Sequence, residues 1–232
     1  MRNSTNVCGG QFEKAMEKSG YGQDGIYRSL RPPLLLPTDP NLSMVSFLFR
    51  NSSSYSDKPA LIDADSGHTL TFSQFKSTVA KLSHAFLHQL GAIATTVNPA
   101  YTVSEIAKQV NDCNPKVIVT VPELWDKNSG SASDLLPVAE IKSSDTAALL
   151  YSSGTTGASK GVMLSHGNFV AAALMVTTDQ KLAGEMHNVY LCVLPLFHVL
   201  GLASIMFAQL QRGNAIVSMG KFGDGFEGCG EA

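Results

Sequence analysis

The stretch Thr146–His166, T-A-A-L-L-Y-S-S-G-T-T-G-A-S-K-G-V-M-L-S-H, decides how the whole chain is interpreted. It opens with an apolar run, 147–151, whose length and composition are typical of a buried strand. Small and hydroxylated residues fill 152–158, and a lysine follows at 160. Such a loop can turn backbone N–H groups inward and add hydroxyls and one ammonium group, a combination that suits a polyphosphate. An ordinary hairpin turn is the alternative, but a turn does not require hydroxyls, glycines and a lysine together.

The loop is not a Walker A motif, G-x-x-x-x-G-K-[ST], because Ser159 precedes the lysine and Gly161 follows it. The flanks differ as well, since a P-loop leads directly into a helix, whereas 161–165 is typical of a second strand. A helix over 169–177 begins only after Ser165 and Asn168, both favourable N-cap residues. We therefore expect the order strand, phosphate loop, strand, helix. This order disfavours an unrelated nucleotide hydrolase or kinase.

The segment Y-S-S-G-T-T-G-A-S-K-G-V, 151–162, closely resembles the signature loop of the adenylate-forming enzymes. These include acyl-CoA synthetases, firefly luciferase and the adenylation domains of peptide synthetases. The resemblance is closest to plant 4-coumarate–CoA ligases and their peroxisomal ligase-like relatives, and it covers about residues 20–222. It implies an α/β fold, in which layered α/β sheets form part of the N-terminal domain of such an enzyme. Ser159 stands where many members carry proline.

The chemistry that the resemblance implies is a two-step ligation that uses ATP, Mg²⁺ and CoA. A carboxylate attacks the α-phosphate of ATP to give an acyl-adenylate and pyrophosphate, and the CoA thiol then attacks the mixed anhydride and releases AMP. Donors around the oxygens that gain charge would stabilise the first transition state. Thr155 and Thr156 are the hydroxyls expected to matter most. The residues expected to bind the phosphates are Ser152, Ser153, Gly154, Thr155, Thr156, Gly157 and Lys160.

The segment L-P-L-F-H-V-L-G, 194–201, carries the resemblance a second time. In the ligase family the histidine that matches His198 lies beside the acyl-adenylate; taken alone, a hydrogen-bonded core histidine would be favoured. The same alignment implies that Leu200 and Ser204 line the acyl pocket and that Lys221 contacts CoA. Coumarate-activating members tend to carry tyrosine at the position of Leu200, so the resemblance favours a fatty or oxylipin-type acid.

Composition excludes several classes of function. The chain has 232 residues, 44% of them hydrophobic, and its 17 basic and 19 acidic residues leave a formal charge of −2 without a basic run. Nucleic acid is therefore not an expected partner. The four scattered cysteines show no metal-ligand spacing and are typical of thiols in a reducing compartment. His84 and His88 are four residues apart, a spacing that could hold a metal, but a solvated helix face is favoured because no third ligand is near.

Targeting signals are not expected. Residues 1–20 lack an apolar core of the secretory type, which predicts a cytoplasmic protein. The chain does not end in a Ser-Lys-Leu type signal, so the peroxisomal import of full-length relatives is not supported. The uncharged run 189–211 has the length of a membrane span, but Pro195, His198 and Gly201 favour a strand, a turn and a core helix instead.

Periodicity and turn residues predict the remaining elements. Asn41–Ser43 precedes a short helix that runs through Phe49. The other expected elements are strands at 60–63 and 68–71, a helix capped by Ser73, a buried strand at 92–97, a turn at 98–102, a helix over 105–113 capped by Ser104, and strands at 116–121, 190–193 and 215–219, with a core helix at 201–210.

The resemblance divides the chain into a disordered extension, 1–20, a partial AMP-binding domain, 21–222, and an aberrant glycine-rich tail, 223–232. Family segments are expected to be missing near Gly91, where about thirty residues are lost, and again near the polar tract 125–133. The Tyr-Gly-x-Thr-Glu element, the ribose-binding aspartate and the C-terminal lid domain with its adenylation lysine are not found.

No catalytic residue is therefore assigned, and little or no turnover is expected of this chain. It would be a partial product of a ligase gene, whose substrate class is a small-molecule carboxylic acid. The alternative is a non-catalytic nucleotide-binding fragment that associates with full-length ligases.

Overall fold

The computed structural model describes residues 20–21, 24–27, 29–30, 33–86, 92–120, 140–152, 159–184 and 187–220. Contacts divide the chain into two units, Met1–Leu35 and Leu36–Ala232. In the first unit, Tyr21 and Tyr27 form an antiparallel bridge and their ring centroids lie 4.8 Å apart. The expected extension lies outside the described residues except for Gly20, and the expected glycine-rich tail lies wholly outside them.

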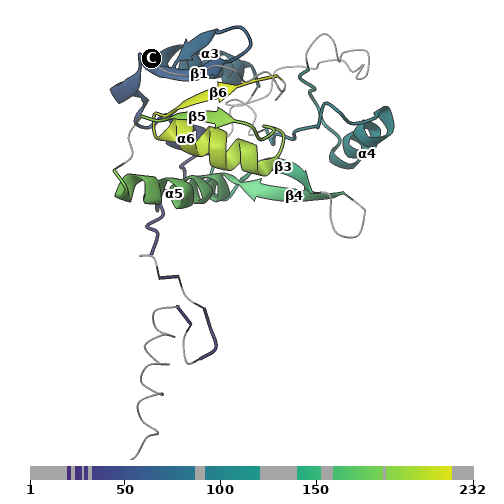
Figure 1. Ribbon diagram of the computed structural model, residues 1–232. Coiled ribbons are helices and arrows are strands. Elements are labelled where there is room, and N and C mark those ends of the chain that lie inside the picture. Colours follow the sequence, from purple (N-terminus) through teal and green to yellow (C-terminus); the bar gives the residue numbers. More distant parts are fainter. Residues whose placement is uncertain are drawn as a thin grey trace, which may run out of the picture. The chain divides into compact units, whose positions relative to one another are not determined.

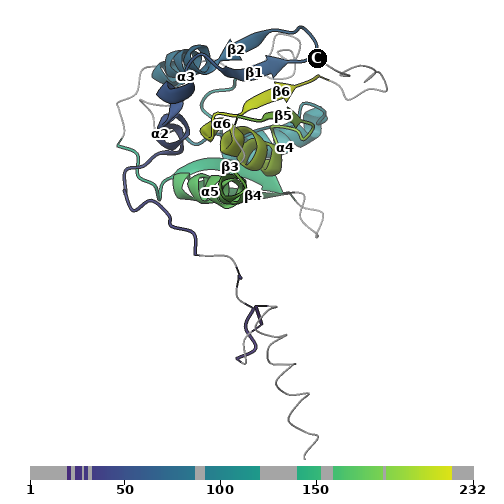
Figure 2. The same ribbon diagram turned by 60° about the vertical axis from the view of Figure 1, so that its left-hand side comes forward.

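A four-stranded sheet in the order β2-β1-β6-β5 organises the second unit (Figure 2). Its strands are β1 (Pro59–Asp63), β2 (Thr69–Thr71), β5 (Val189–Cys192) and β6 (Ala215–Ser218). The pairs β1–β6 and β5–β6 are parallel and β1–β2 is antiparallel, so the expected parallel pairs are confirmed. The expectation of a buried strand at 190–193 is only half right. Cys192 is 7% exposed, but Leu191 is 38% and Val193 is 54% exposed, so only one face of this edge strand is covered.

The predicted order of strand, loop, strand and helix is confirmed. Strands β3 (Thr146–Ser152) and β4 (Lys160–Ser165) form a separate antiparallel two-stranded sheet, and α5 (His166–Leu182) follows β4 directly. The Ser165 side chain accepts a hydrogen bond from the Asn168 N–H, and the Asn168 side chain accepts one from the Ser165 N–H, which is a capping box. The hairpin is therefore fixed at its base by the start of a long helix.

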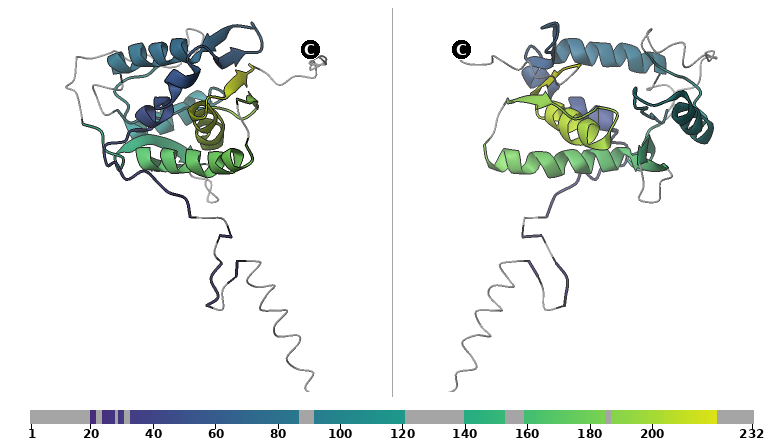
Figure 3. Two further views of the ribbon diagram at one scale, coloured as in Figure 1. Left: turned by 90° about the vertical axis from the view of Figure 1, so that its left-hand side faces the viewer. Right: turned by 45° about the vertical axis from the view of Figure 1, so that its right-hand side comes forward.

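The helices form layers with the sheet (Figures 1 and 3). The π-helix η3 (Leu200–Phe207) continues into α6 (Ala208–Gln211), which confirms the predicted core helix. Both segments contact α5, while η3 also contacts β5 and α6 contacts β6, so they lie between α5 and the sheet. Helix α3 (Phe72–Phe86) packs on β1 and β2, and α2 (Met44–Phe49) packs on α5 and α6. The 3₁₀ turn η1 (Ser52–Tyr55) and α4 (Val103–Cys113) are further helical segments.

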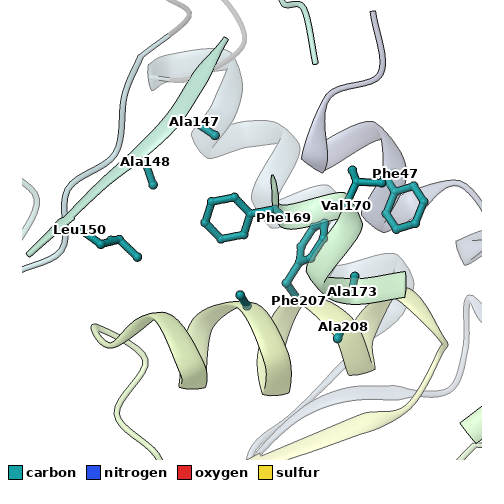
Figure 4. Close-up of a cluster of buried hydrophobic side chains, with 10 residues drawn as sticks. Phe47, Ala147, Ala148, Leu150, Phe169, Val170, Ala173, Phe207 and Ala208 are labelled. Atoms are coloured by element: carbon teal, nitrogen blue, oxygen red, sulfur yellow. The ribbon is translucent and has the colours of Figure 1, made fainter. Parts of the chain in front are cut away.

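Aromatic side chains join α2, α5, η3 and β3 in one hydrophobic cluster (Figure 4), and the four-stranded sheet packs in a second cluster around Tyr55 and Phe72. Phe207 of η3 is 2% exposed, and its ring centroid lies 6.2 Å from that of Phe47 and 6.0 Å from that of Phe169. Leu150 of β3 belongs to the same cluster. Burying such rings supplies most of the packing free energy, roughly 1.5–3 kcal/mol for each side chain. Strand β3, which leads into the predicted phosphate loop, therefore packs against α2, α5 and η3 through this cluster.

Two predicted strands are wrong. Within 92–97 the only described pairing is one parallel bridge, from Ala94 to Ala148, and Ile93 is 54% exposed. The segment 116–120 has no regular structure and Val119 is 82% exposed, while residue 121 lies outside the description. Apolar content made both segments look like buried strands, but a strand also needs a partner along its length, and sequence periodicity does not supply one.

Two predicted N-caps are wrong by two residues. Helix α4 is capped by Thr102, whose side chain accepts from the Glu105 N–H while the Glu105 carboxylate accepts from the Thr102 N–H. At the start of α3, Thr71 Oγ1 accepts from the Gln74 N–H at 3.3 Å, and Gln74 Oε1 accepts from the Thr71 N–H at 2.9 Å. Ser104 and Ser73 stand inside the first turns instead. The turn at 98–102 is confirmed by the bond from the Tyr101 N–H to the Asn98 carbonyl.

No helix in the described ranges is long and apolar enough to cross a membrane. Cys113 and Cys192 are both free thiols, whereas Cys8 and Cys229 lie outside the described residues.

Candidate functional site

The β3–β4 hairpin places the two ends of the predicted phosphate loop opposite each other. Ser152 pairs with Lys160 at the last rung of the ladder, after the pairs Tyr151–Gly161 and Leu150–Val162. The side chains of Ser152 and Lys160 are exposed. The loop residues Ser153, Gly154, Thr155, Thr156 and Gly157 lie outside the described residues. Ser152 and Lys160, a hydroxyl and an ammonium residue, thus lie opposite each other at the mouth of the loop.

The start of α5 is not available to bind an anion. Its first backbone N–H, from His166, donates to the Asp145 carbonyl at 3.1 Å, and that of Gly167 donates to the Ser143 carbonyl at 2.8 Å. The Asn168 N–H is taken by the Ser165 cap. Because these donors are already used, the predicted phosphate site would depend on the loop and on Lys160 rather than on the helix terminus.

Tyr151 ties the mouth of the loop to α4. Its hydroxyl donates to the Oδ2 atom of Asp112, near the C-terminal end of that helix. Burial, and then this hydrogen bond to Asp112, raise the pKa of Tyr151, so the phenol stays protonated at neutral pH. Asp112 was not predicted as a site residue. Its contact joins residues 39 apart in the chain, a pairing that sequence periodicity cannot reveal.

His198 lies in a turn between β5 and η3, as predicted. The His198 N–H donates to the Pro195 carbonyl at 3.0 Å, and the Leu200 N–H donates to His198 Nδ1 at 3.2 Å. A neutral ring whose Nδ1 accepts must carry its proton on Nε2. The side chain of His198 is exposed, so it is not the core histidine that its sequence context alone would favour. The ring is therefore accessible from solvent.

Glycine is required just after this turn. A Cβ atom on Gly201 would lie 2.4 Å from the Pro195 carbonyl oxygen, well inside van der Waals contact. The close approach is what allows η3 to begin directly after the histidine. Leu200 is 49% exposed and Ser204 is half-buried, and both lie on η3, which begins one residue before the predicted helix; Lys221 lies outside the described residues.

One extended segment links the hairpin to the histidine turn. The Ala94 N–H donates to the Ala147 carbonyl at 3.1 Å, and the Leu149 N–H donates to the Ala94 carbonyl at 2.8 Å. Two residues later, Thr96 Oγ1 donates to the Phe197 carbonyl at 2.7 Å. Thr96 therefore positions the residue next to His198, a role that the sequence did not indicate.

Metal ligands do not gather in the part of the chain that the structure describes, where no group of three His, Cys, Asp or Glu side chains could hold an ion.

Comparisons with known proteins agree with this arrangement. A family model described as "AMP-binding enzyme" matches residues 87–228. A probable CoA ligase from Humulus lupulus, CCL5, is 32% identical over 268 residues, covering 89% of this chain and 48% of its own length. The peroxisomal OPC-8:0-CoA ligase 1 of Arabidopsis thaliana is 31% identical, with coverage of 88% and 48%.

Solved structures show the same fold. ATP-bound MatB from Rhodopseudomonas palustris superimposes with a TM-score of 0.64 at 23% identity, covering 79% of this chain and 46% of that one. A long-chain-fatty-acid-CoA ligase, FadD1, from Archaeoglobus fulgidus gives a TM-score of 0.66 at 19% identity, covering 83% and 50%. The likeness extends over most of the described chain and therefore confirms the predicted α/β fold.

The chain spans about half the length of the curated relatives that it matches. The aligned stretch of 268 residues is also longer than the 232 residues of this chain, which agrees with the predicted internal losses.

Proposed function

Because the chain belongs to the family of AMP-binding enzymes, we propose that its β3–β4 loop binds the phosphates of ATP for an acid–CoA ligase reaction. The observation that carries this proposal is the Ser152–Lys160 pair, which closes a hydroxyl- and glycine-rich loop at its base. An ammonium group held at the mouth of such a loop stabilises the charge of a triphosphate, and the loop N–H groups and hydroxyls add directed hydrogen bonds.

The reaction has two steps. A carboxylate oxygen attacks the α-phosphorus of ATP, the bond to the β-phosphate oxygen breaks, and pyrophosphate leaves with the negative charge. The sulfur of CoA then attacks the acyl carbon, the bond to AMP breaks, and the thiol proton passes to solvent. Lys160 and the loop residues Ser152, Ser153, Gly154, Thr155, Thr156 and Gly157 would hold the phosphates in the first step.

The histidine turn would receive the acid. The ring of His198 is accessible from solvent, and Leu200 and Ser204 follow it on η3, so an acyl group at this turn would meet both apolar and hydroxyl groups. Leu200 favours an aliphatic acid over a hydroxycinnamate. Lys221 would contact CoA. Mg²⁺ would accompany ATP as part of the substrate complex, and no step is assigned to it.

The test is a thermal melt of the purified chain with increasing ATP and Mg²⁺. A ligand that binds only the native state raises its stability by about 2.7 kcal/mol at a hundred times its Kd. Lys160→Ala should weaken ATP binding by roughly 10- to 100-fold, since a hydrogen bond to a charged group contributes about 1.5–3 kcal/mol. Lys116→Ala is the control, because Lys116 is an exposed lysine in irregular structure. Equal ATP affinity in both variants would refute the assignment of the loop.

A pyrophosphate-exchange assay with added carboxylic acids tests the ligase reaction against the alternative of a non-catalytic nucleotide-binding chain. Exchange that depends on the acid supports the ligase reaction. ATP binding without exchange agrees with the little or no turnover expected of this chain, and co-purification with a full-length ligase would then favour the alternative, a non-catalytic nucleotide-binding fragment.

A further inference from the structure

Strand β5 is an open edge of the four-stranded sheet (Figure 2). It pairs with β6 on one side, and within the ranges that the structure describes no strand pairs with it on the other. The Asn188 carbonyl, just before the strand, accepts from the Ala215 N–H of β6 at 3.0 Å. Because successive residues of an extended chain turn their backbone groups to opposite sides, Val189, Leu191 and Val193 direct theirs away from β6. These three residues therefore carry the backbone donors and acceptors of the open edge.

The side chains of the same three residues are apolar and reach water. Val189 is 63% exposed, Leu191 38% and Val193 54%, and their alternate spacing places them on one face of the sheet. Leu191 is in register with Val217 of β6, and Val217 with Ile62 of β1, both half-buried. An apolar row thus crosses the sheet and ends in water at Leu191. A strand that continued this row would remove apolar surface from water, which is favourable.

The opposite edge of the sheet is built differently. Strand β2 has only three residues, and its ladder with β1 is interrupted by a register shift. Short edge strands and irregular pairing are devices that prevent a sheet from accepting another strand. Strand β5 has neither device, since it pairs with β6 without a shift over all four of its residues, and 189–211 contains no charged residue. The β5 edge is therefore the one suited to strand addition.

The pattern of this edge matches itself. If two copies pair antiparallel about a two-fold axis at Leu191, Leu191 lies opposite its own copy and Val189 lies opposite Val193. All three pairs are then of the hydrogen-bonded type, because each residue directs its N–H and C=O to the edge. Apolar side chains meet apolar side chains, and no charge in 189–211 meets its own copy. A charged partner strand would gain no ion pair here, so a second copy is the better match.

We propose that β5 binds a second copy of this chain by antiparallel pairing centred on Leu191, so that the two four-stranded sheets join into one. A contact limited to a few residue pairs is small beside the roughly 1,200–2,000 Å² that specific, stable complexes bury. The dimer is therefore weak and reversible, with a Kd in the micromolar range. The proposal does not rest on the ligase function, because Val189, Leu191 and Val193 are not among the residues proposed to bind phosphate, acid or CoA.

Sedimentation velocity of the full purified chain, at concentrations from about 1 to about 300 µM, measures this equilibrium. Leu191→Lys should raise the Kd for dimerisation by roughly tenfold or more, because the two-fold axis places the two ammonium groups directly opposite each other. The matched control is Met163→Lys, since Met163 is also an exposed apolar strand residue, 73% exposed, but lies on β4 in the other sheet. It should leave the Kd unchanged.

A charge exchange at the axis tests the register itself. Leu191→Glu should weaken dimerisation for the same reason as Leu191→Lys, whereas an equimolar mixture of the two variants should associate again, because a lysine then faces a glutamate. Recovery in the mixture also shows that both variants are folded. Val189→Lys repeats the test at a more exposed residue, and it too should raise the Kd, because it removes the apolar pair with Val193.

Four outcomes would overturn the proposal. A chain that stays monomeric at every concentration would refute it, as would equal losses in Leu191→Lys and Met163→Lys. Failure of the mixed lysine and glutamate variants to associate would refute the antiparallel pairing at Leu191. A monomeric chain that binds a purified full-length 4-coumarate–CoA ligase in the same experiment, and loses that binding in Leu191→Lys, would assign the β5 edge to that partner instead of to a second copy.

Discussion

Gly213→Ala tests how tightly the core is packed beneath the sheet. Gly213 joins α6 to β6 with a φ of +83°, and its N–H donates to the Leu210 carbonyl at 3.0 Å. A Cβ atom built there would lie 2.8 Å from Cδ1 and 2.9 Å from Cε1 of Tyr55. The Tyr55 ring has little room to move, because it packs against Phe72 at 4.6 Å between centroids and donates its hydroxyl to the Gln211 carbonyl at 3.1 Å.

Two penalties of the same sign follow. A left-handed backbone costs an alanine about 1–2 kcal/mol relative to glycine. Inserting a methyl group against a fixed ring costs roughly a further 1–3 kcal/mol. Gly67→Ala isolates the first penalty, because Gly67 has a φ of +71° and its added Cβ would meet nothing within 4 Å. We therefore expect Gly213→Ala to lower the free energy of unfolding by about 2–5 kcal/mol, and Gly67→Ala by only about 1–2 kcal/mol.

The assay is urea unfolding of the full chain and both variants, followed by far-ultraviolet circular dichroism and tryptophan fluorescence. A difference between the two variants smaller than about 0.5 kcal/mol would show that Tyr55 yields freely and that the close packing argued here is wrong. A double-mutant cycle with Tyr55→Ala adds an internal check. Without the ring, Gly213→Ala should cost no more than Gly67→Ala.

Two further predictions concern a helix cap and a half-buried histidine. Thr102→Ala should destabilise α4 by about 0.5–2 kcal/mol, seen as faster hydrogen exchange of its amides, and Ser104→Ala should have a clearly smaller effect, because Ser104 lies inside the helix and does not cap it. Burial lowers the pKa of His166 below its ordinary value of 6.5, although Asp145 opposes the shift, and its Nδ1 accepts from the Met44 N–H at 3.2 Å. The unfolded chain therefore takes up this proton first, so the stability that His166 contributes is complete above about pH 6.5 and is lost as the pH falls below it. Denaturation midpoints between about pH 7.5 and 5.5 should fall less steeply in His166→Gln than in the parent chain, and identical slopes would contradict this origin.

The hairpin and α5 could be predicted because the signals for them are local. The apolar run 147–151 and the N-cap pair Ser165 and Asn168 lie within a few residues of the elements that they specify. The core helix at 201–210 was predictable for a related reason, since Pro195 and Gly201 mark where the turn ends. The structure adds the cause at Gly201, whose missing side chain lets η3 pass the Pro195 carbonyl.

The correct N-caps, Thr102 and Thr71, could have been recognised in the sequence, although Ser104 and Ser73 were predicted instead. Both helices begin after a Thr-x-Ser pattern, so either hydroxyl could cap the helix on composition alone. The deciding feature is the residue three positions after the threonine, Glu105 for Thr102 and Gln74 for Thr71, because only that spacing allows the side chain to return a bond to the capping residue.

The errors at 92–97 and 116–120 have a different origin. Whether an apolar run becomes a strand depends on a partner that lies far away in the chain. Ala94 finds that partner for one residue pair with β3, while Val117, Ile118 and Val119 face water. The role of Asp112 could not be predicted for the same reason, because its contact with Tyr151 joins α4 to a hairpin that is distant in the chain.

The two halves of the candidate site belong to different sheets, so their relative position depends on the segment between them. The β3–β4 hairpin forms one sheet, and the turn that carries His198 follows β5, an edge strand of the other sheet. Ala94 pairs with β3 and Thr96 holds the Phe197 carbonyl, and in extended chain these two residues are only about 7 Å apart. A single short segment therefore fixes both β3, which leads into the predicted phosphate loop, and the turn that carries His198. Phosphate and acid binding, if they occur at the proposed places, would both depend on the position of this segment, although the two places share no strand.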